Sequence, residues 1–301
     1  MHRAQGLLAT SRETKLEIIR GISDLRARLA VARDQHGSVG LVPTMGAIHR
    51  GHLALVDLAR LETDFVAASL FVNPAQFGPG EDFSRYPRDE KRDAALLEAA
   101  GCELLFAPSV EEMYPKGYST RIDVGPIAEP LEGEIRSGHF PGVAAIVAKL
   151  LIAAAPDAAV FGEKDYQQFL VIRRLVRDLG LAVRILAAPT VREADGLAVS
   201  SRNAYLSPSE RGIAASLHAA LARASLRISA GDSLCDVERA GREALLRAGF
   251  SSVDYFAVRE AETLDRPEGP LAQPLRLLVA AHLGSTRLID NVAAEPNGRA
   301  G

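Results

Sequence analysis

The sequence of 301 residues has no tryptophan, three methionines and two cysteines. Cys102 and Cys235 are widely separated and have no metal-like spacing, which excludes a disulfide framework and favours ordinary thiols of a reducing compartment. No apolar run is long enough to span a membrane, and the N-terminus lacks the apolar segment of a signal peptide. We therefore expect a cytoplasmic protein without a membrane partner.

The charge balance is also unremarkable, with a formal net charge of −3 and a pI near 6.2. Nucleic-acid-binding proteins usually carry an extended basic surface that displaces counterions, so we expect no nucleic-acid partner. Hydrophobic residues make up 48% of the chain, and its length favours two domains.

Apolar runs of strand length alternate with helical patterns through the first part of the chain. Such alternation predicts an α/β fold, a Rossmann-like doubly wound parallel sheet with helices on both faces, over residues 1–187. The expected strands are 39–42, 65–72, 103–106, 158–161 and 181–187, and the expected helices are 15–33, 53–60, 89–100, 141–155 and 168–179.

The texture changes after Pro189, where a second, smaller α+β domain is expected over residues 188–292, serving as a lid. Ser207, Pro208 and Glu210 have the spacing of a capping box with proline at the first helical position. We expect helices at 209–229 and 233–248, strands at 253–258, 275–281 and 286–289, and a disordered tail at 293–301.

The chain is organised around residues 41–52, an apolar run that breaks at Pro43 and Gly46 and leads into a helix. A helix start presents free N–H groups and a positive dipole end, which suit a triphosphate. His49 and His52 lie three residues apart, on one side of the turn. The stretch also fits an ordinary surface turn with two histidines. A zinc site would need a third ligand, and none is nearby.

Two more polar turns, residues 73–78 and 162–165, follow expected strands, so all three turns should meet at the carboxyl edge of the sheet. Lys164 could neutralise charge on a phosphoryl group and Asp165 could hold a ribose hydroxyl or a metal, although a solvated ion pair is equally ordinary. Residues 199–203 of the second domain, with Ser200 to Arg202, could close over phosphates or form a polar surface turn.

Neutral amides near these turns suit a hydroxylated carboxylic acid. They are Asn73, Gln76, Gln167 and Gln168. Residues 136–140, before an apolar helix, could form another anion site or a mobile lid, whereas His139 could also cap a helix or lie in the core.

Six stretches together resemble the pantoate–β-alanine ligase (pantothenate synthetase) family, in family order and over roughly residues 15–292. They are residues 43–52, 71–78, 85–88, 138–143, 161–168 and 200–203. The His-x-Gly-His pattern alone marks a wider superfamily of nucleotidyl transferases, whereas the full set is specific. The resemblance implies that pantoate attacks the α-phosphorus of ATP, pyrophosphate leaves, and β-alanine displaces AMP from a pantoyl adenylate.

The resemblance also implies residue roles, with His52 as proton donor and His49, Lys164 and Arg202 acting on the phosphates. Pantoate would bind Gln76 and Gln168, β-alanine would bind Gln76, and Mg²⁺ would bridge the phosphates with Asp93 as a candidate contact. The family is expected to form homodimers. The ATP site would consist of Met45, Gly46, Ala47, Ile48, His49, Arg50, Gly51, His52, Gly162, Glu163, Lys164, Asp165, Val191, Val199, Ser200, Ser201 and Arg202.

The chain departs from the family pattern at Ala145, where a threonine is usual, and at Ile152, where an asparagine is usual. Two other functions fit the same turns. An adenylyltransferase acting on a phosphorylated acceptor would need a cationic acceptor pocket, and a nucleotide-binding regulator would bind ATP without turnover.

Overall fold

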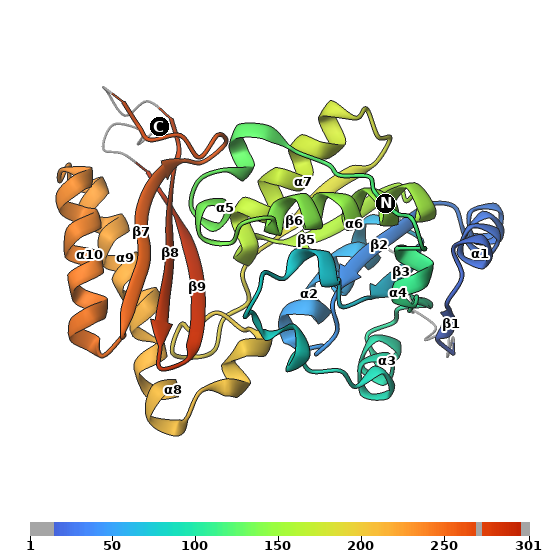
Figure 1. Ribbon diagram of the computed structural model, residues 1–301, viewed down its shortest axis with the longest axis horizontal. Coiled ribbons are helices and arrows are strands. Elements are labelled where there is room, and N and C mark those ends of the chain that lie inside the picture. The colour runs from blue at the N-terminus through green and yellow to red at the C-terminus, as the bar shows by residue number, and fades with distance from the viewer. Residues whose placement is uncertain (1–14, 269–272, 296–301) are drawn as a thin grey trace, which may run out of the picture.

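The computed structural model describes residues 15–268 and 273–295 (Figure 1). A parallel sheet has the strand order β1-β4-β3-β2-β5-β6, which confirms the predicted doubly wound α/β fold. Its strands are β1 (Glu17–Ile19), β2 (Val39–Thr44), β3 (Phe65–Leu70), β4 (Leu104–Phe106), β5 (Ala158–Gly162) and β6 (Arg184–Ala188).

Successive side chains of each strand point to opposite sides, so both faces of this sheet carry apolar residues, and helices cover both faces. Leu41 belongs to one hydrophobic cluster and Val42 to the other. The first cluster includes α1 (Ile22–His36), α6 (His139–Ala154) and α7 (Tyr166–Asp178), and the second includes α2 (Arg50–Glu62) and α3 (Glu90–Ala99). Short helices α4 (Val110–Met113) and α5 (Glu132–Ile135) lie in the connection before α6.

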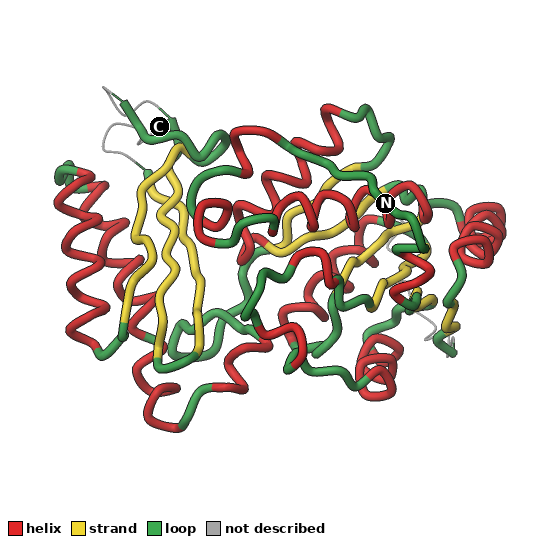
Figure 2. Tube along the Cα trace, viewed as in Figure 1, coloured by secondary structure: helices red, strands yellow, loops and turns green. Residues whose placement is uncertain are grey.

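A second, antiparallel sheet of order β7-β8-β9 forms the smaller part (Figure 2). The strands β7 (Ser252–Glu260), β8 (Leu275–Leu283) and β9 (Thr286–Ala294) carry α9 (Ser216–Ser229) and α10 (Leu234–Ala248) on their outer face (Figure 1). The predicted capping box begins α8 (Pro208–Ala214). On the inner face, Ala257 and Leu278 join the first cluster of the parallel sheet, so the two sheets share buried contacts.

Three elements differ from the sequence prediction. The segment expected to begin a helix at Lys15 instead forms β1, which pairs with β4, and the helix begins only at Ile22. The helix expected over 209–229 divides into α8 and α9 at Ala215. Strand β9 continues to Ala294, so Ala293 and Ala294 are not part of a tail. Glu295 lies outside any helix or strand, and the last residues of that predicted tail, 296–301, lie outside the described residues.

Strand order reverses between β2 and β5, because the chain adds β3 and β4 on one side of β2 and β5 and β6 on the other. Ligands of open α/β sheets bind beyond the carboxyl ends of the strands at such a switch point. The turns after β2 and β5, which contain His49 and Lys164, therefore lie at the expected place. Within the described ranges, no helix is both long and apolar enough to cross a membrane.

Candidate active site

The three turns meet residues of the second domain around one cavity of about 220 Å³. The first turn contributes Met45, His49, Gly51 and His52, and the second contributes Asn73 and Gln76. The third turn and α7 contribute Gly162, Lys164, Asp165 and Gln168, and the second domain contributes Val191 and the strip Val199, Ser200, Ser201 and Arg202. The predicted convergence is confirmed for these residues.

The first turn is fixed by a buried carboxylate. Asp93 of α3 is 1% exposed, and its two oxygens accept hydrogen bonds from the backbone N–H groups of Ala47 and Ile48, both at 2.8 Å. Gly46 and Ala47 both have positive φ, and a Cβ on Gly46 would come within 3.0 Å of the carboxylate. Asp93 therefore compensates a costly backbone conformation.

This role differs from the predicted contact of Asp93 with a metal. Both carboxylate oxygens already bind backbone N–H groups, and the side chain does not line the cavity. The described residues contain no cluster of three histidine, cysteine or acidic side chains that could hold a metal ion. The zinc interpretation of His49 and His52 therefore gains no support.

His49 and His52 stack with ring centroids 4.0 Å apart. The N–H of His49 donates to Nδ1 of His52 at 3.4 Å, which leaves Nε2 of His52 as the protonated nitrogen. Burial, the neighbouring His49 and Lys164 lower the pKa of His52 to about 3, and burial and Lys164 lower that of His49 to about 4. Both imidazoles are therefore neutral at pH 7.

Glycine is required at position 51, between the two histidines in the sequence. A Cβ on Gly51 would lie 2.9 Å from Cε1 of His49, closer than a carbon can approach without displacing the ring. The small residue thus keeps His49 beside His52 at the helix start.

Lys164 lies in the 3-10 turn η4 (Glu163–Asp165), directly after β5. Its Nζ is 3.5 Å from Asp165 Oδ1, and the lysine side chain is 20% exposed. A partly solvated ammonium group paired this loosely can change partner when an anion enters, because such an ion pair contributes little stability.

Arg202 belongs to η5 (Ser201–Tyr205) and pairs with Asp82 of η2 (Asp82–Ser84). Its Nε and Nη2 donate to the two carboxylate oxygens at 3.1 and 2.9 Å, so the guanidinium plane is fixed. Nη1 takes no part in this fork.

We call the part of the cavity lined by neutral amides the acid end, because these amides suit a carboxylic acid. It is organised around Gln76, whose Oε1 accepts a hydrogen bond from Asn73 at 3.0 Å. Asn73 also donates to Gly142 O and accepts from Tyr114 Oη. Its amide is therefore fixed and positions the side chain of Gln76. Nε2 of Gln76 lies 3.0 Å from the sulfur of Met45, a weak acceptor that a ligand oxygen can replace.

His139 and Arg136 line the same end of the cavity and support Gln76. Nδ1 of His139 donates to Gln76 O at 2.8 Å, and Nε2 lies 3.0 Å from Nη1 of Arg136. Burial and the guanidinium of Arg136 lower the pKa of His139 to about 4. Arg136 itself forms a fork with Glu81, both distances 2.8 Å. His139 is thus a buried, hydrogen-bonded histidine, as in the core interpretation, but it also lines the cavity.

Several predicted residues do not line the cavity. Gly46, Ala47 and Ile48 act through the backbone of the first turn, Arg50 pairs with Glu193 at the surface, and Glu163 pairs with Arg276. Gln167 turns its amide to Ile127 O and Pro130 O. Ala145 is buried outside the cavity, and Ile152 is 56% exposed.

Other lining residues were not expected. Tyr86 lies in a motif that carried the resemblance but received no role; it is 6% exposed, and burial raises its pKa. An apolar wall also escaped prediction because its residues lie in or directly beside helices and strands whose apolar pattern is that of any core. It consists of Leu55, Phe71, Val143, Ile146, Val147, Leu150 and Phe161.

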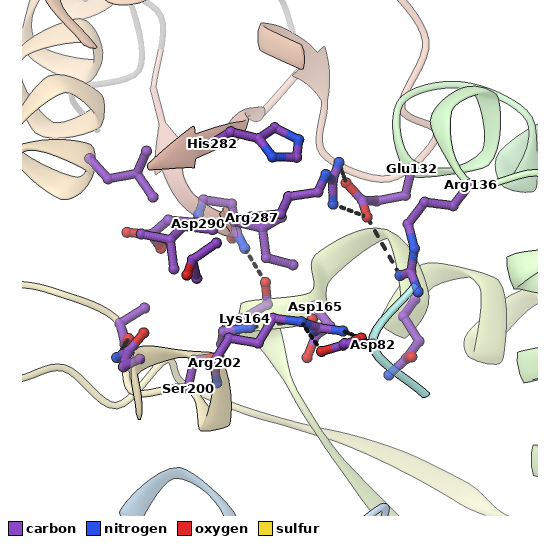
Figure 3. Close-up of a pocket in the computed structure, with 18 of the residues that line it drawn as sticks. Asp82, Glu132, Arg136, Lys164, Asp165, Ser200, Arg202, His282, Arg287 and Asp290 are labelled. Carbon is purple, nitrogen blue, oxygen red and sulfur yellow. Dashed lines mark hydrogen bonds and ion pairs between the residues drawn. The ribbon is translucent and has the colours of Figure 1, made fainter. Parts of the chain in front are cut away.

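A second cavity of about 260 Å³ adjoins the first, between the two domains (Figure 3). Lys164, Ser200 and Arg202 lie on one side, and Arg287, Glu132 and Arg136 on the other (Figure 3). Arg287 of β9 donates to both oxygens of Glu132 at 2.7 and 2.8 Å and so joins the domains. The fold and this site define an α/β protein with a polar cavity at the switch point of its parallel sheet, bordered by residues of the second, smaller sheet and suited to an anionic ligand.

Comparison with known proteins gives the family. A family model described as Pantoate-beta-alanine ligase matches residues 17–293. The pantothenate synthetase of Paramagnetospirillum magneticum is 53% identical over 94% of this chain and 99% of its own length. That of Rhodospirillum rubrum is 53% identical over 92% and 98%.

Two solved structures agree with this result. The pantothenate synthetase of Thermus thermophilus has a TM-score of 0.86 at 52% identity, covering 92% of this chain and 98% of that one. A Francisella tularensis pantoate-beta-alanine ligase, described as complexed with beta-gamma ATP and beta-alanine, has a TM-score of 0.77 at 32% identity, covering 92% and 97%. The chain belongs to the pantoate-beta-alanine ligase family, which confirms the predicted enzyme class.

Proposed function

We propose that this chain condenses pantoate with β-alanine through a pantoyl adenylate, releasing pyrophosphate and AMP. In the first step a pantoate carboxylate oxygen bonds to the α-phosphorus while the bond to the β-phosphate oxygen breaks. In the second step the amine of β-alanine bonds to the acyl carbon and AMP leaves. The observation that carries this proposal is the single cavity shared by His52, Lys164 and Arg202 from the phosphate-binding turns and Gln76 and Gln168 from the acid end.

Attack at phosphorus places negative charge on the nonbridging and leaving oxygens, so fixed donors lower the barrier most. His52 presents its Nε2–H as a neutral donor, supported by its Nδ1 contact and its low pKa. This refines the expected proton donor, because a neutral imidazole donates a hydrogen bond far more readily than a proton. His49, Lys164 and Arg202 are proposed to contact the phosphates, with Ser200 and Ser201 beside them.

Gln76 and Gln168 are proposed to hold the hydroxyl and carboxylate oxygens of pantoate, and Gln76 also the β-alanine. The dimethyl carbon of pantoate would then contact the apolar wall, for example Phe71 and Val143. A phosphorylated acceptor would suit this end poorly, since the amides are neutral. The arginine beside Gln76 in this cavity, Arg136, is already paired with Glu81, which disfavours the adenylyltransferase alternative.

Mg²⁺ is proposed to enter as part of the substrate, bound to ATP phosphates. The described residues provide no cluster of metal ligands, so we derive no step through a protein-bound metal. We further propose a cytoplasmic homodimer, for which the family is the support. Sedimentation equilibrium tests the homodimer, and a single species with the mass of one chain would contradict it.

The intermediate is tested by exchange of radiolabelled pyrophosphate into ATP. Exchange that needs pantoate and magnesium but not β-alanine supports the adenylate, whereas exchange only when β-alanine is present contradicts it. Product analysis completes the test: AMP and pantothenate should form together only when all three substrates and magnesium are supplied. Binding of ATP without any pyrophosphate release would favour the regulator.

A further inference from the structure

We propose that Asn291 of β9 is a positioning residue for Lys164, holding the turn that carries the lysine from the second domain. This inference rests on the proposed adenylation of pantoate, in which Lys164 contacts the phosphates of ATP. Asn291 is 3% exposed; it lines the second cavity but not the first, and its side chain reaches the backbone of η4.

The contact is specific for an amide. Nδ2 of Asn291 donates one hydrogen to Glu163 O and the other to Lys164 O, both at 2.9 Å. These carbonyl groups flank the Cα atom of Lys164, so the two bonds fix the direction in which its side chain leaves the turn. Aspartate has no hydrogens to donate there, and serine has only one.

The amide is itself held on the opposite side. Its Oδ1 accepts from Nε of Arg276 at 2.7 Å, and the backbone N–H of Asn291 donates to Asp290 at 2.7 Å. Asn291 pairs with Leu278 across the strands, so Arg276 is a diagonal neighbour on the same face.

Arg276 brings a second set of contacts to the same turn. Its guanidinium lies 4.0 Å from the ring centroid of Tyr166, the first residue of α7, and Nη2 lies 3.3 Å from Glu163 Oε2. The 3-10 turn η4 has no side-chain cap of its own. The second domain therefore supplies the side-chain hydrogen bonds that the turn lacks. The position of Lys164 thus depends on the packing of the second domain against the first.

The test is a double-mutant cycle between Asn291→Ala and Lys164→Met, measured as the rate of pantoate-dependent pyrophosphate exchange. Displacement of a catalytic group by about 1 Å costs up to about 100-fold, so Asn291→Ala should lose about 10- to 100-fold in the exchange rate at saturating substrates, with little change in KM for pantoate. In the Lys164→Met background the same substitution should change the rate less than about twofold.

Arg173→Gln is the matched control, because the exposed Arg173–Glu262 pair also joins the domains without touching η4. It should retain wild-type exchange. If Asn291→Ala does not fold, Asn291→Asp replaces it in the cycle, since the carboxylate keeps the shape and the Arg276 contact but cannot donate.

Equal losses in both backgrounds, or wild-type exchange for Asn291→Ala, would overturn the inference. A wild-type enzyme without pantoate-dependent exchange would instead overturn the proposed function, so the two failures are distinguishable.

Discussion

The two walls of the proposed anion site are suited to an anion by different physical means. The turn after β2 offers neutral imidazoles, and its shape is set by Asp93, which accepts the N–H groups of Ala47 and Ile48. The strip at Val199–Arg202 instead offers a full positive charge, already paired with Asp82. Fixed dipoles need no rearrangement when charge develops, whereas a paired charge must be shared with the ligand. The first wall should therefore contribute most to rate, and the second most to phosphate binding.

The largest expected effect is at His52. His52→Ala should slow pyrophosphate exchange by about two to four orders of magnitude, because the donor facing the phosphates is lost. His52→Gln carries an N–H near the position of Nε2 and should recover part of this rate. Near wild-type exchange for His52→Ala would show that the first wall does not act on the reacting phosphate.

Removing the support of the first turn comes next. Asp93→Ala leaves the buried N–H groups of Ala47 and Ile48 without partners and should lower the free energy of unfolding by about 2–4 kcal/mol. Urea unfolding measures this loss, and kcat should fall in the remaining folded enzyme. Asp89→Ala removes the exposed cap of the same helix and serves as control, with a cost of about 1 kcal/mol and an unchanged kcat.

The second wall is tested by Arg202→Lys, which keeps the charge but cannot form the fork with Asp82. We expect about a tenfold rise in KM for ATP with a smaller change in kcat, in steady-state assays. Arg211→Lys breaks a similar but exposed fork with Asp195 and should behave as wild type. A loss confined to kcat would contradict the proposed division between the walls.

The smallest effect concerns the buried imidazole behind the acid end. The unfolded chain takes up a proton at His139 as pH falls through 6.5, but the folded protein does so only near pH 4. The contribution of neutral His139 to the free energy of unfolding is therefore fully present above pH 6.5. It is lost on acidification, at about 1 kcal/mol per pH unit. Urea unfolding between pH 7 and 5 should show a shallower loss for His139→Gln, and identical slopes would contradict a lowered pKa.

The same comparison explains what could be predicted from sequence. The first wall is local: a strand, a glycine turn and a helix start lie within residues 41–52, and periodicity is sufficient to order them. Lys164 was found for the same reason. The supporting roles of Asp93 for the first turn and of Asn291 for Lys164 were not predicted, because these residues reach their partners across 45 and 127 residues of sequence. The polar pair Asp290-Asn291 inside an apolar strand was the available signal for the latter.

Strand β1 illustrates the same limit on a smaller scale. Its residues have helical periodicity with the segment that follows, and only hydrogen bonds to β4, distant in sequence, make them a strand. The break between α8 and α9 at Ala215 likewise carries no proline or glycine, so local propensity predicted one helix.

The inner face of the small sheet has a consequence for production of the protein. Ala257 and Leu278 complete the core built on the parallel sheet, and Tyr255 packs beside them. A fragment ending at Ala188 would expose the hydrophobic surface that these side chains cover, and exposed hydrophobic surfaces promote aggregation. Expressed alone, this fragment should accumulate in inclusion bodies, and co-expression with the missing half should return it to the soluble fraction.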